Sequence, residues 1–261
     1  MTKARGINDR HHAPGRKKLL RIAGLPAVSA LFATAPERVE RLFFDARLKP
    51  HVNAFCAELA RRRKSYRLAG ADEMKRIAGS AMHGGIVALA APRPVGILHP
   101  ATDAAKLAEW ARDARLLLLL DGVGNPHNLG AIARSAAFFG VARMVLSDHP
   151  AQAAPSDASY RVAEGGLEHL ELWRARNFAR ALAALRRHYL VVGAAAEGGV
   201  AMSSLKIDRP IALVLGNEER GLPPATLKSC EQIVTIPGAG QIESLNVAAS
   251  AAILLYGLSA Q

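Results

Sequence analysis

Three short segments in the C-terminal half of the chain place glycine, amide and charged side chains at the ends of apolar runs. They are Asn-Pro-His-Asn-Leu-Gly-Ala-Ile-Ala-Arg at 125–134, Leu-Gly-Asn-Glu-Glu-Arg-Gly-Leu at 215–222, and Ile-Pro-Gly at 236–238 followed by Ser-Leu-Asn-Val-Ala at 244–248. In α/β proteins, ligand sites are built where strands end. Each segment is therefore a candidate part of a ligand site.

The first segment follows five leucines at 116–120 and is preceded by Gly122 and Gly124, which superficially match a dinucleotide-binding loop. The third glycine of that fingerprint is missing, because Pro126 and His127 fill the following positions. A Rossmann-type cofactor site is therefore disfavoured.

Asn128 and Arg134 are the side chains of the first segment that could act on a substrate. Taken alone, Asn128 is typical of a helix N-cap and Arg134 of a solvated helical arginine. Six helical residues place the two about 120° apart around the axis, so they need not share a face, although both can border one cleft.

Together and in this order, the three segments resemble the motifs of the SpoU (TrmH) branch of the SPOUT RNA methyltransferases. Enzymes of that family methylate ribose 2′-hydroxyls of RNA with S-adenosylmethionine. The resemblance implies that Asn128 and Arg134 handle the acceptor ribose, and that Glu218, Ser244 and Asn246 complete the catalytic set. Taken alone, Glu218 and Ser244 would each be expected to cap the helix that follows them.

The resemblance also implies a cofactor pocket and a fold. The residues implied to bind S-adenosylmethionine are Leu215, Gly216, Asn217, Ile236, Pro237, Ser244, Leu245, Asn246 and Ala248. The implied fold is α/β: a C-terminal SPOUT α/β-knot, which is a deep trefoil knot on a mostly parallel sheet, and a small N-terminal α/β RNA-binding domain that resembles ribosomal proteins. No metal is expected.

The role of Arg134 is open between two hypotheses. A methyl group on a sulfonium needs little activation, so the enzyme must mainly align the 2′-oxygen with the methyl carbon. Proposals for the family make the arginine a general base, yet a guanidinium is a very weak acid and resists deprotonation. The alternative keeps Arg134 cationic, as a clamp for a neighbouring phosphate that also stabilises alkoxide character.

The charge of the chain is concentrated away from the three segments. The 261 residues carry a formal net charge of +12, and residues 1–98 hold 19 Lys and Arg against 7 Asp and Glu. Residues 116–261 hold 12 of each kind. Because neutralising phosphates supplies most non-specific affinity for nucleic acid, this asymmetry indicates RNA capture by the N-terminal part and chemistry in the rest.

The candidate RNA-binding residues are Arg61, Arg62, Arg63, Lys64, His83 and Arg161. The four consecutive cations are the densest basic patch, although a solvated helix end would look the same. His83 begins a His-Gly-Gly pattern that matches the family's accessory domain or forms a plain turn. Arg161 belongs to the charged, Gly-Gly-containing stretch 160–169, which has the composition of a mobile substrate loop or of a merely solvated one.

Alternating strand and helix patterns, which include strands expected at 116–120 and 211–215, predict the domain organisation. We expect a basic arm at 1–18, an RNA-binding domain at 19–98, a linker helix at 99–115 and the methyltransferase domain at 116–261. The final helix, expected at about 245–258, is apolar nearly all round, which indicates burial within the chain or against a second copy. A homodimer through the knotted domain is therefore expected.

Cysteine usage and hydropathy indicate a cytoplasmic protein. Cys56 and Cys230 are far apart and lack zinc-ligand spacing, so neither a disulfide framework nor a metal site is predicted. The stretch 16–35 imitates a signal peptide, but Arg21 and Pro26 interrupt its apolar run. No stretch reaches the length of a membrane span.

Two other functions remain open at this point. A catalytically idle RNA-binding or ribosome-assembly protein could keep the same fold, but it would be expected to lose some of the five catalytic residues. A base methyltransferase of a related knotted family would place the methyl group on guanine instead of ribose.

Overall fold

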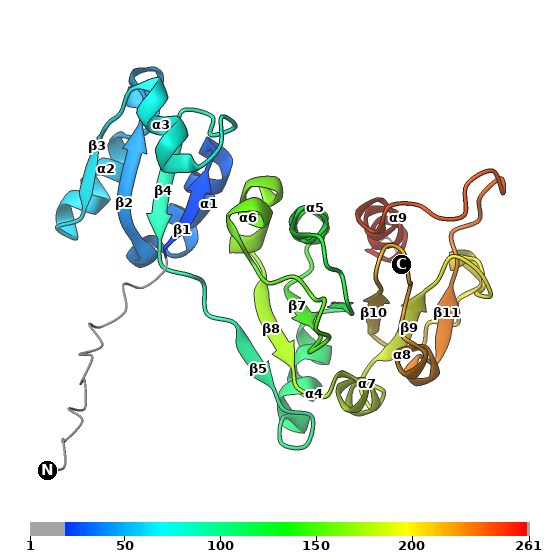
Figure 1. Ribbon diagram of the computed structural model, residues 1–261. Coiled ribbons are helices and arrows are strands. Elements are labelled where there is room, and N and C mark those ends of the chain that lie inside the picture. Colours follow the sequence, from blue (N-terminus) through cyan, green and yellow to red (C-terminus); the bar gives the residue numbers. More distant parts are fainter. Residues whose placement is uncertain (1–18, 260–261) are drawn as a thin grey trace, which may run out of the picture.

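The computed structural model describes residues 19–259, which form two α/β units side by side (Figure 1). The basic arm expected at 1–18 lies outside the described residues. The smaller unit has a four-stranded sheet in the order β1-β4-β2-β3. Its elements are β1 (Leu20–Ala23), α1 (Leu25–Thr34), β2 (Val39–Phe44), α2 (Asn53–Arg61), β3 (Ser65–Leu68), α3 (Ala71–Ala78) and β4 (Ile86–Ala90), with the 3-10 helices η1 (Pro36–Arg38) and η2 (Ala46–His51).

Helices cover both faces of the small sheet. Val28 and Leu31 of α1 and Leu59 of α2 pack on one face, while Met74 of α3 is buried against Phe43 on the other. The strand β3 lies at one edge of the sheet and exposes all four of its residues. The small unit therefore presents β3 to solvent as an open edge.

The larger unit is a seven-stranded sheet in the order β11-β9-β10-β6-β7-β8-β5, in which every neighbouring pair is parallel. Its strands are β5 (Gly96–Leu98), β6 (Leu116–Leu120), β7 (Arg143–Leu146), β8 (Glu171–Ala175), β9 (Leu190–Ala194), β10 (Ile211–Leu215) and β11 (Gln232–Val234). Its helices are α4 (Ala104–Asp113), α5 (Pro126–Phe138), α6 (Asp157–Ala163), α7 (Phe178–Leu185), α8 (Pro224–Ser229) and α9 (Val247–Ser259), with the 3-10 helices η3 (Gly166–Glu168) and η4 (Met202–Ser204).

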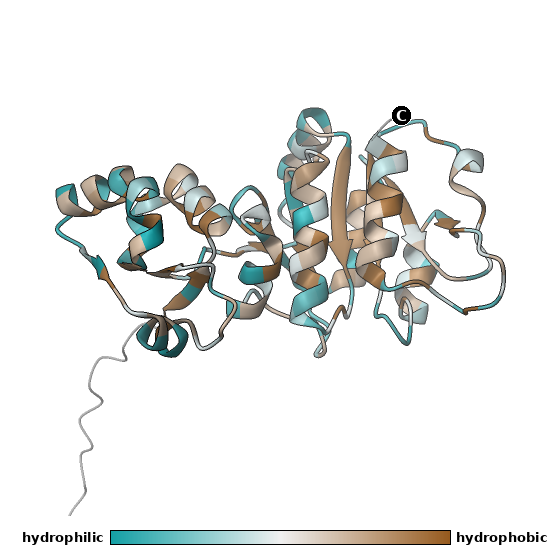
Figure 2. Ribbon diagram, turned by 90° about the horizontal axis from the view of Figure 1, so that it is seen from above, coloured by the Kyte–Doolittle hydropathy of each residue, from teal (hydrophilic) through white to brown (hydrophobic). Residues whose placement is uncertain are grey.

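The leucine run of β6 is buried on both faces because successive side chains point to opposite sides of the sheet. Leu118 and Leu120 join the core beneath α5, α6 and α9, whereas Leu117 and Leu119 join the core beneath α4, α7 and α8. Figure 1 shows these two helical layers above and below the sheet. In Figure 2 the strands at the centre are brown and most polar colour lies on the outer helices.

No helix within residues 19–259 is long and apolar enough to cross a membrane. The same residues hold no cluster of three His, Cys, Asp or Glu side chains that could bind a metal ion.

The strands predicted at 116–120 and 211–215 are confirmed residue for residue. Two other segments differ from expectation. The short β5 lies within 19–98, the range expected for the small domain, yet it pairs with β8 in the large sheet. The predicted mobile loop at 160–169 is instead the end of α6 followed by η3, and its Tyr160, Leu167 and Glu168 are buried.

A buried ionic network joins the two units. The Glu168 carboxylate of η3 lies 2.5 Å from a guanidinium nitrogen of Arg38 in the small unit and 3.4 Å from one of Arg93 in the connecting segment. Arg38 also donates to the Ala91 carbonyl at 3.0 Å, and Arg93 donates to the Leu167 carbonyl at 3.3 Å. Because the Glu168 side chain is excluded from solvent, it depends on these two cations for its charge compensation.

The residue Tyr160 of α6 lies beside this network. Burial, followed by the nearby Glu168 carboxylate, raises the pKa of the Tyr160 hydroxyl above its ordinary value. The tyrosine therefore stays neutral, and the charges of the network are confined to the two arginines and the glutamate.

The variant Glu168→Gln tests this junction. It leaves the buried Arg38 guanidinium without its counter-ion, so we expect the free energy of unfolding to fall by about 3 kcal/mol in urea denaturation. The control is Glu109→Gln, at an exposed glutamate of α4, which should unfold like the wild type. Equal stability of the two variants would contradict the role given to the network.

Candidate active site

The loops that follow β6 and β10 leave the sheet at the same point. The two strands pair in parallel with Leu120 opposite Leu215, and the pairing continues as the Asp121 amide donates to the Leu215 carbonyl at 2.9 Å. Because all strands of this sheet are parallel, the loop after β11 begins at the same edge. The three segments singled out in the sequence therefore converge there.

The helix α5 begins one turn earlier than the sequence indicated. Asn125 is its N-cap, since the Asn125 side chain accepts from the His127 amide at 2.8 Å, and Pro126 occupies the first helical position, where no amide hydrogen is needed. The capping role that Asn128 would have if it were considered alone is thus taken by Asn125. Asn128 lies within the first turn, and its side chain is free for contacts outside the helix.

A chain of side-chain hydrogen bonds links the three segments. Asn246 donates from Nδ2 to Oδ1 of Asn128 at 3.2 Å, and Asn128 donates from its own Nδ2 to Oε1 of Glu218. The side-chain nitrogen Nδ2 of Asn217 lies 3.2 Å from the other carboxylate oxygen of Glu218, and it donates to the Gly122 carbonyl at 3.0 Å. These partners orient the Asn128 amide, because its oxygen faces a donor and its nitrogen faces a carboxylate.

The final helix begins at Val247, later than predicted. The Asn246 Oδ1 atom accepts from the Ala248 amide at 2.8 Å, which makes Asn246 the capping side chain. The expectation that Ser244 caps this helix is therefore wrong, and Ser244 lies exposed two residues before the cap. Asn246 thus holds α9 with its oxygen and Asn128 with its nitrogen.

The loop after β10 closes on itself. Asn217 and Gly221 exchange two backbone hydrogen bonds of 3.0 Å, and the Asn217 side-chain oxygen accepts from the amides of Glu219 and Arg220. A Cβ atom on Gly216 would lie 2.4 Å from the Gly221 carbonyl carbon, so Gly216 allows this close approach of the loop's own backbone. Glu218 does not cap the following helix, because its carboxylate faces Asn128 instead.

The remaining predicted cofactor residues lie around the loop after β11. Ile236 and Ala248 are half-buried and pack against the core, whereas Pro237 and Leu245 are exposed. Leu245 thus adds exposed apolar surface beside the polar side chains of Asn128 and Asn246.

Two cavities of about 440 and 330 Å³ open at the same edge, towards α7 and α8. Both are lined by Asp121 and His149, and Asn217 lines the larger one. The buried Asp121 accepts from the Thr226 hydroxyl at 2.6 Å, which ties the end of β6 to α8. Asp121, His149 and Thr226 were not among the residues predicted from the sequence, although an aspartate directly after an apolar strand was a usable signal.

Arg134 lies outside the chain of hydrogen bonds that joins the three segments. It is on α5, and its exposed guanidinium pairs with the Glu164 carboxylate at 2.9 Å. Arg134 comes six residues after Asn128 in α5, which places the two side chains about 120° apart around the helix axis. The site therefore has a fixed amide and carboxylate part and an accessible cationic part.

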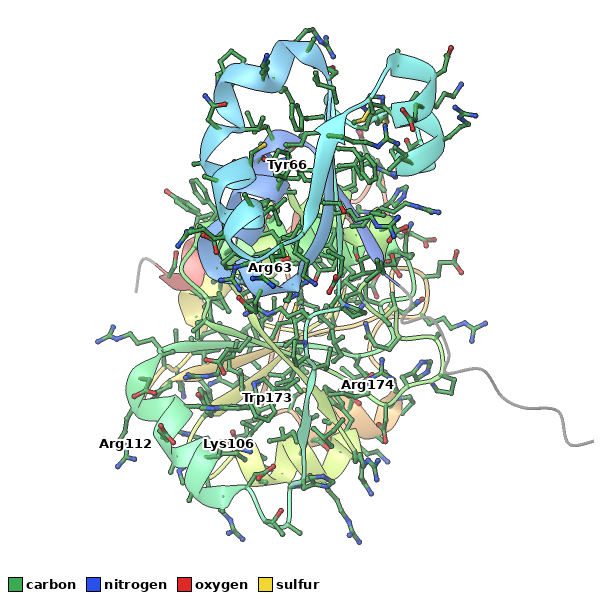
Figure 3. All side chains as sticks on the ribbon, turned by 90° about the vertical axis from the view of Figure 1, so that its left-hand side faces the viewer. Arg63, Tyr66, Lys106, Arg112, Trp173 and Arg174 are labelled. Atoms are coloured by element: carbon green, nitrogen blue, oxygen red, sulfur yellow. The ribbon has the colours of Figure 1, made fainter. Side chains whose placement is uncertain are left out.

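The predicted RNA-binding residues have different surroundings. Arg62 and Lys64 pair with Glu58 and Glu40, each at 2.5 Å, and Arg61 also pairs with Glu58. Arg63 is exposed and lies on the same side of the molecule as Tyr66 (Figure 3).

The other two candidates lie elsewhere. The His83 Nδ1 atom accepts from the Gly85 amide at 3.1 Å, so its ring takes part in the turn before β4. Arg161 is half-buried on α6.

Two alanine variants distinguish the capping residues. Asn246→Ala removes the cap of α9, so we expect the free energy of unfolding to fall by about 1 kcal/mol. Ser244→Ala is the matched control and should leave the urea midpoint unchanged, because helix α9 begins after Asn246. A larger loss in the serine variant would reverse the assignment.

Comparisons with known proteins agree with this geometry. Residues 115–256 match the SpoU rRNA Methylase family, and residues 21–95 match the RNA 2′-O ribose methyltransferase substrate-binding family. The chain is 35% identical over 245 residues to the 23S rRNA (guanosine-2′-O-)-methyltransferase RlmB of Acinetobacter baylyi, which covers 89% of this chain and 94% of that protein. It is also 35% identical to RlmB of Escherichia coli K12 over 242 residues, which cover 90% and 96% of the two chains.

A solved structure shares the fold. The S-adenosylmethionine-bound rRNA methyltransferase of Sinorhizobium meliloti superposes with a TM-score of 0.73 at 22% identity, covering 92% of this chain and 87% of that one. The relatives are matched over nearly their whole length, and the family match contains all three segments that form the site. The resemblance inferred from the motifs is thus confirmed, and the chain belongs to the SpoU rRNA methylase family.

Proposed function

We propose that the protein transfers a methyl group from S-adenosylmethionine to a ribose 2′-hydroxyl of structured RNA. The observation that carries this proposal is the chain of hydrogen bonds from Asn246 through Asn128 to Glu218, which joins the three motifs. The names of the RlmB relatives favour a guanosine of 23S ribosomal RNA as the acceptor, with transfer RNA as the other candidate.

Asn128 is suited to position the acceptor ribose. Its amide nitrogen has two hydrogens, of which one is donated to Glu218, and its oxygen has two lone pairs, of which one accepts from Asn246. One donor and one acceptor position remain for a ribose hydroxyl. Because Glu218 and Asn246 hold the amide in place, the hydroxyl would be aligned without a further loss of side-chain freedom.

Arg134 is suited to hold a phosphate next to that ribose. Its guanidinium is exposed and offers several donors in one plane, which match the oxygens of a phosphate. In this role Arg134 would also stabilise negative charge that develops on the 2′-oxygen, while the proton leaves to phosphate or water.

The neighbouring residues fit S-adenosylmethionine. The cofactor supplies an electrophilic methyl group on a sulfonium when it is bound. Ile236 and Leu245 offer apolar surface for an adenosine, and Glu218 offers a carboxylate for the positive charge of the cofactor. We propose that Leu215, Gly216 and Asn217 line the same pocket. We further propose that Pro237, Ser244, Asn246 and Ala248 complete this pocket and that the chain forms the deep trefoil knot of the family here.

The small unit is proposed to select the RNA. Its family match is a substrate-binding family, and the formal excess of positive charge lies within residues 1–98. We keep Arg61, Arg62, Arg63, Lys64, His83 and Arg161 as RNA-binding candidates. Arg63 and Tyr66 are the side chains best placed to meet RNA first, because Tyr66 is exposed on the open edge strand β3 and Arg63 is exposed just before it.

Methyl transfer to RNA tests the proposed function. The protein is incubated with labelled S-adenosylmethionine and total RNA from cells that lack it, and the modified nucleotide is mapped. Ribose methylation should make one linkage resistant to alkaline cleavage, because the 2′-hydroxyl is blocked. Label on a base, or cofactor binding without any labelled RNA, would refute this function and favour a base methyltransferase or an idle RNA-binding protein.

The same assay tests whether the reaction needs the planar guanidinium of Arg134. In Arg134→Lys the positive charge remains but the planar pair of donors is lost, so we expect the turnover to fall by about ten-fold or more. Wild-type turnover in this variant would exclude both the planar clamp and the arginine base.

A homodimer is also proposed, within the cytoplasm. The aromatic side chains of Phe138 on α5 and Tyr256 on α9 are 83% and 67% exposed, and Ile253 adds to the same apolar surface. The rings of Phe138, Phe139 and Tyr256 follow one another at centroid distances of 5.1 and 6.1 Å. An exposed apolar cluster on two adjacent helices is typical of an interface between subunits.

Light scattering on purified protein tests the dimer. Tyr256→Glu places a charge in the proposed interface, so we expect the mass to fall from two chains to one. Met82→Glu is the control, since Met82 is 74% exposed on the small unit, and its mass should equal that of the wild type. A monomeric wild type would rule the dimer out.

A further inference from the structure

The segment 164–168 lies between the small unit and the helix that bears Arg134. A Cβ atom on Gly165 would lie 2.8 Å from Cβ of Ala30 in α1, and one on Gly166 would lie 2.8 Å from Cα of Arg134 in α5. The backbone therefore packs directly against both elements. Such contacts leave this segment little room to move independently of either unit.

The far end of the segment is held by the buried network described above, in which Glu168 pairs with Arg38 and Arg93. Its near end is Glu164, the residue that ends α6 in a left-handed conformation with φ 44°. A residue with a side chain is disfavoured in this region, so the position is imposed by its surroundings. The backbone of Glu164 is thus fixed relative to α5.

The Glu164 carboxylate pairs with the Arg134 guanidinium, the group proposed to hold the RNA phosphate. Its Oε2 atom lies 2.9 Å from a terminal nitrogen of Arg134, and the two side chains are 47% and 57% exposed. A carboxylate and a phosphate present similar oxygen pairs to a guanidinium. Because the pair is solvated, its attraction is weak and is screened by salt. An RNA phosphodiester, which carries the same single charge and is held close by the small unit, can therefore replace the carboxylate.

We propose that Glu164 occupies the phosphate site of Arg134 in the RNA-free protein and must be displaced when RNA binds. Competition from Glu164 would lower the affinity of Arg134 for RNA. Arg134 would then bind only a phosphate that the small unit has already brought close. This inference rests on the proposed function, since it takes Arg134 to be a phosphate clamp. Glu164 acts through Arg134 and is a positioning residue.

The direct test is RNA affinity, measured by filter binding of labelled 23S ribosomal RNA transcribed in vitro. Glu164→Gln keeps the shape of the side chain but removes its charge, so we expect Kd at low salt to fall by about two- to five-fold, the range of an exposed ion pair. The difference should vanish at about 1 M salt, where charges are screened over a few ångströms. Glu109→Gln, an exposed glutamate of α4 on the other face of the sheet, should bind RNA like the wild type.

A double-mutant cycle separates this effect from a general change in charge. In an Arg134→Ala background the Glu164→Gln change should no longer alter Kd, because the guanidinium for which it competes is absent. An equal gain in both backgrounds would overturn the proposal in favour of long-range electrostatics. Glu164→Gly is a second variant that suits the positive φ, and it should fold at least as stably and bind RNA as tightly as the glutamine variant.

Steady-state kinetics supply a second criterion. Displacement predicts a lower KM for RNA in Glu164→Gln with kcat changed by less than about two-fold. A lower kcat with unchanged KM would overturn the proposal, because Glu164 would then orient Arg134 for the reaction. If the wild type binds RNA but transfers no methyl group, the proposed function fails while the binding cycle still tests Glu164. If it methylates RNA and Kd is unchanged in Glu164→Gln, this inference alone fails.

Discussion

The parallel pairing of β6 and β10 is the constraint on which the rest of the site depends. Because Leu120 lies opposite Leu215, the segments that carry Asn128 and Glu218 leave adjacent strands at the same level. The Asn128 amide therefore meets the Glu218 carboxylate, which is 90 residues away in sequence. A register shift of one residue would move Leu213 and Leu215 into the core beneath α7 and α8, where the smaller Ala212 and Val214 now pack. The hydrophobic pattern of two strands therefore also determines the geometry of the polar site at their ends.

The parts of the structure that local patterns determine were predictable from the sequence. The apolar run at 116–120 is bounded by Arg115 and Asp121 and the run at 211–215 by Pro210 and Gly216, and both are strands with those bounds. The helix caps were not predictable, because Asn125 competes with Asn128, and Asn246 with Ser244, for the same role. Which residue caps the final helix also depends on a contact over more than 100 residues, the one between Asn246 and Asn128.

The contact between the two units was equally hidden from sequence reasoning. Glu168 belongs to a stretch whose glycines and charges are typical of a mobile loop, yet its carboxylate is buried between Arg38 and Arg93. A buried ion pair adds little net stability over an apolar contact of the same size, but it is strongly directional. Its effect is then to fix how the small unit sits against η3 and, through Gly166, against the helix of Arg134.

This arrangement relates the uneven charge of the chain to the reaction. The unit that holds Asn128 and Arg134 has as many acidic as basic residues, so it provides no large field to attract RNA, and its Arg134 is already paired. Attraction must come from the basic N-terminal part, whose contact with η3 is rigid. Binding energy gathered there can raise the local concentration of phosphate at Arg134 without strengthening the contacts made by the reacting ribose. An RNA that fits only one unit would consequently be bound without being aligned for the reaction.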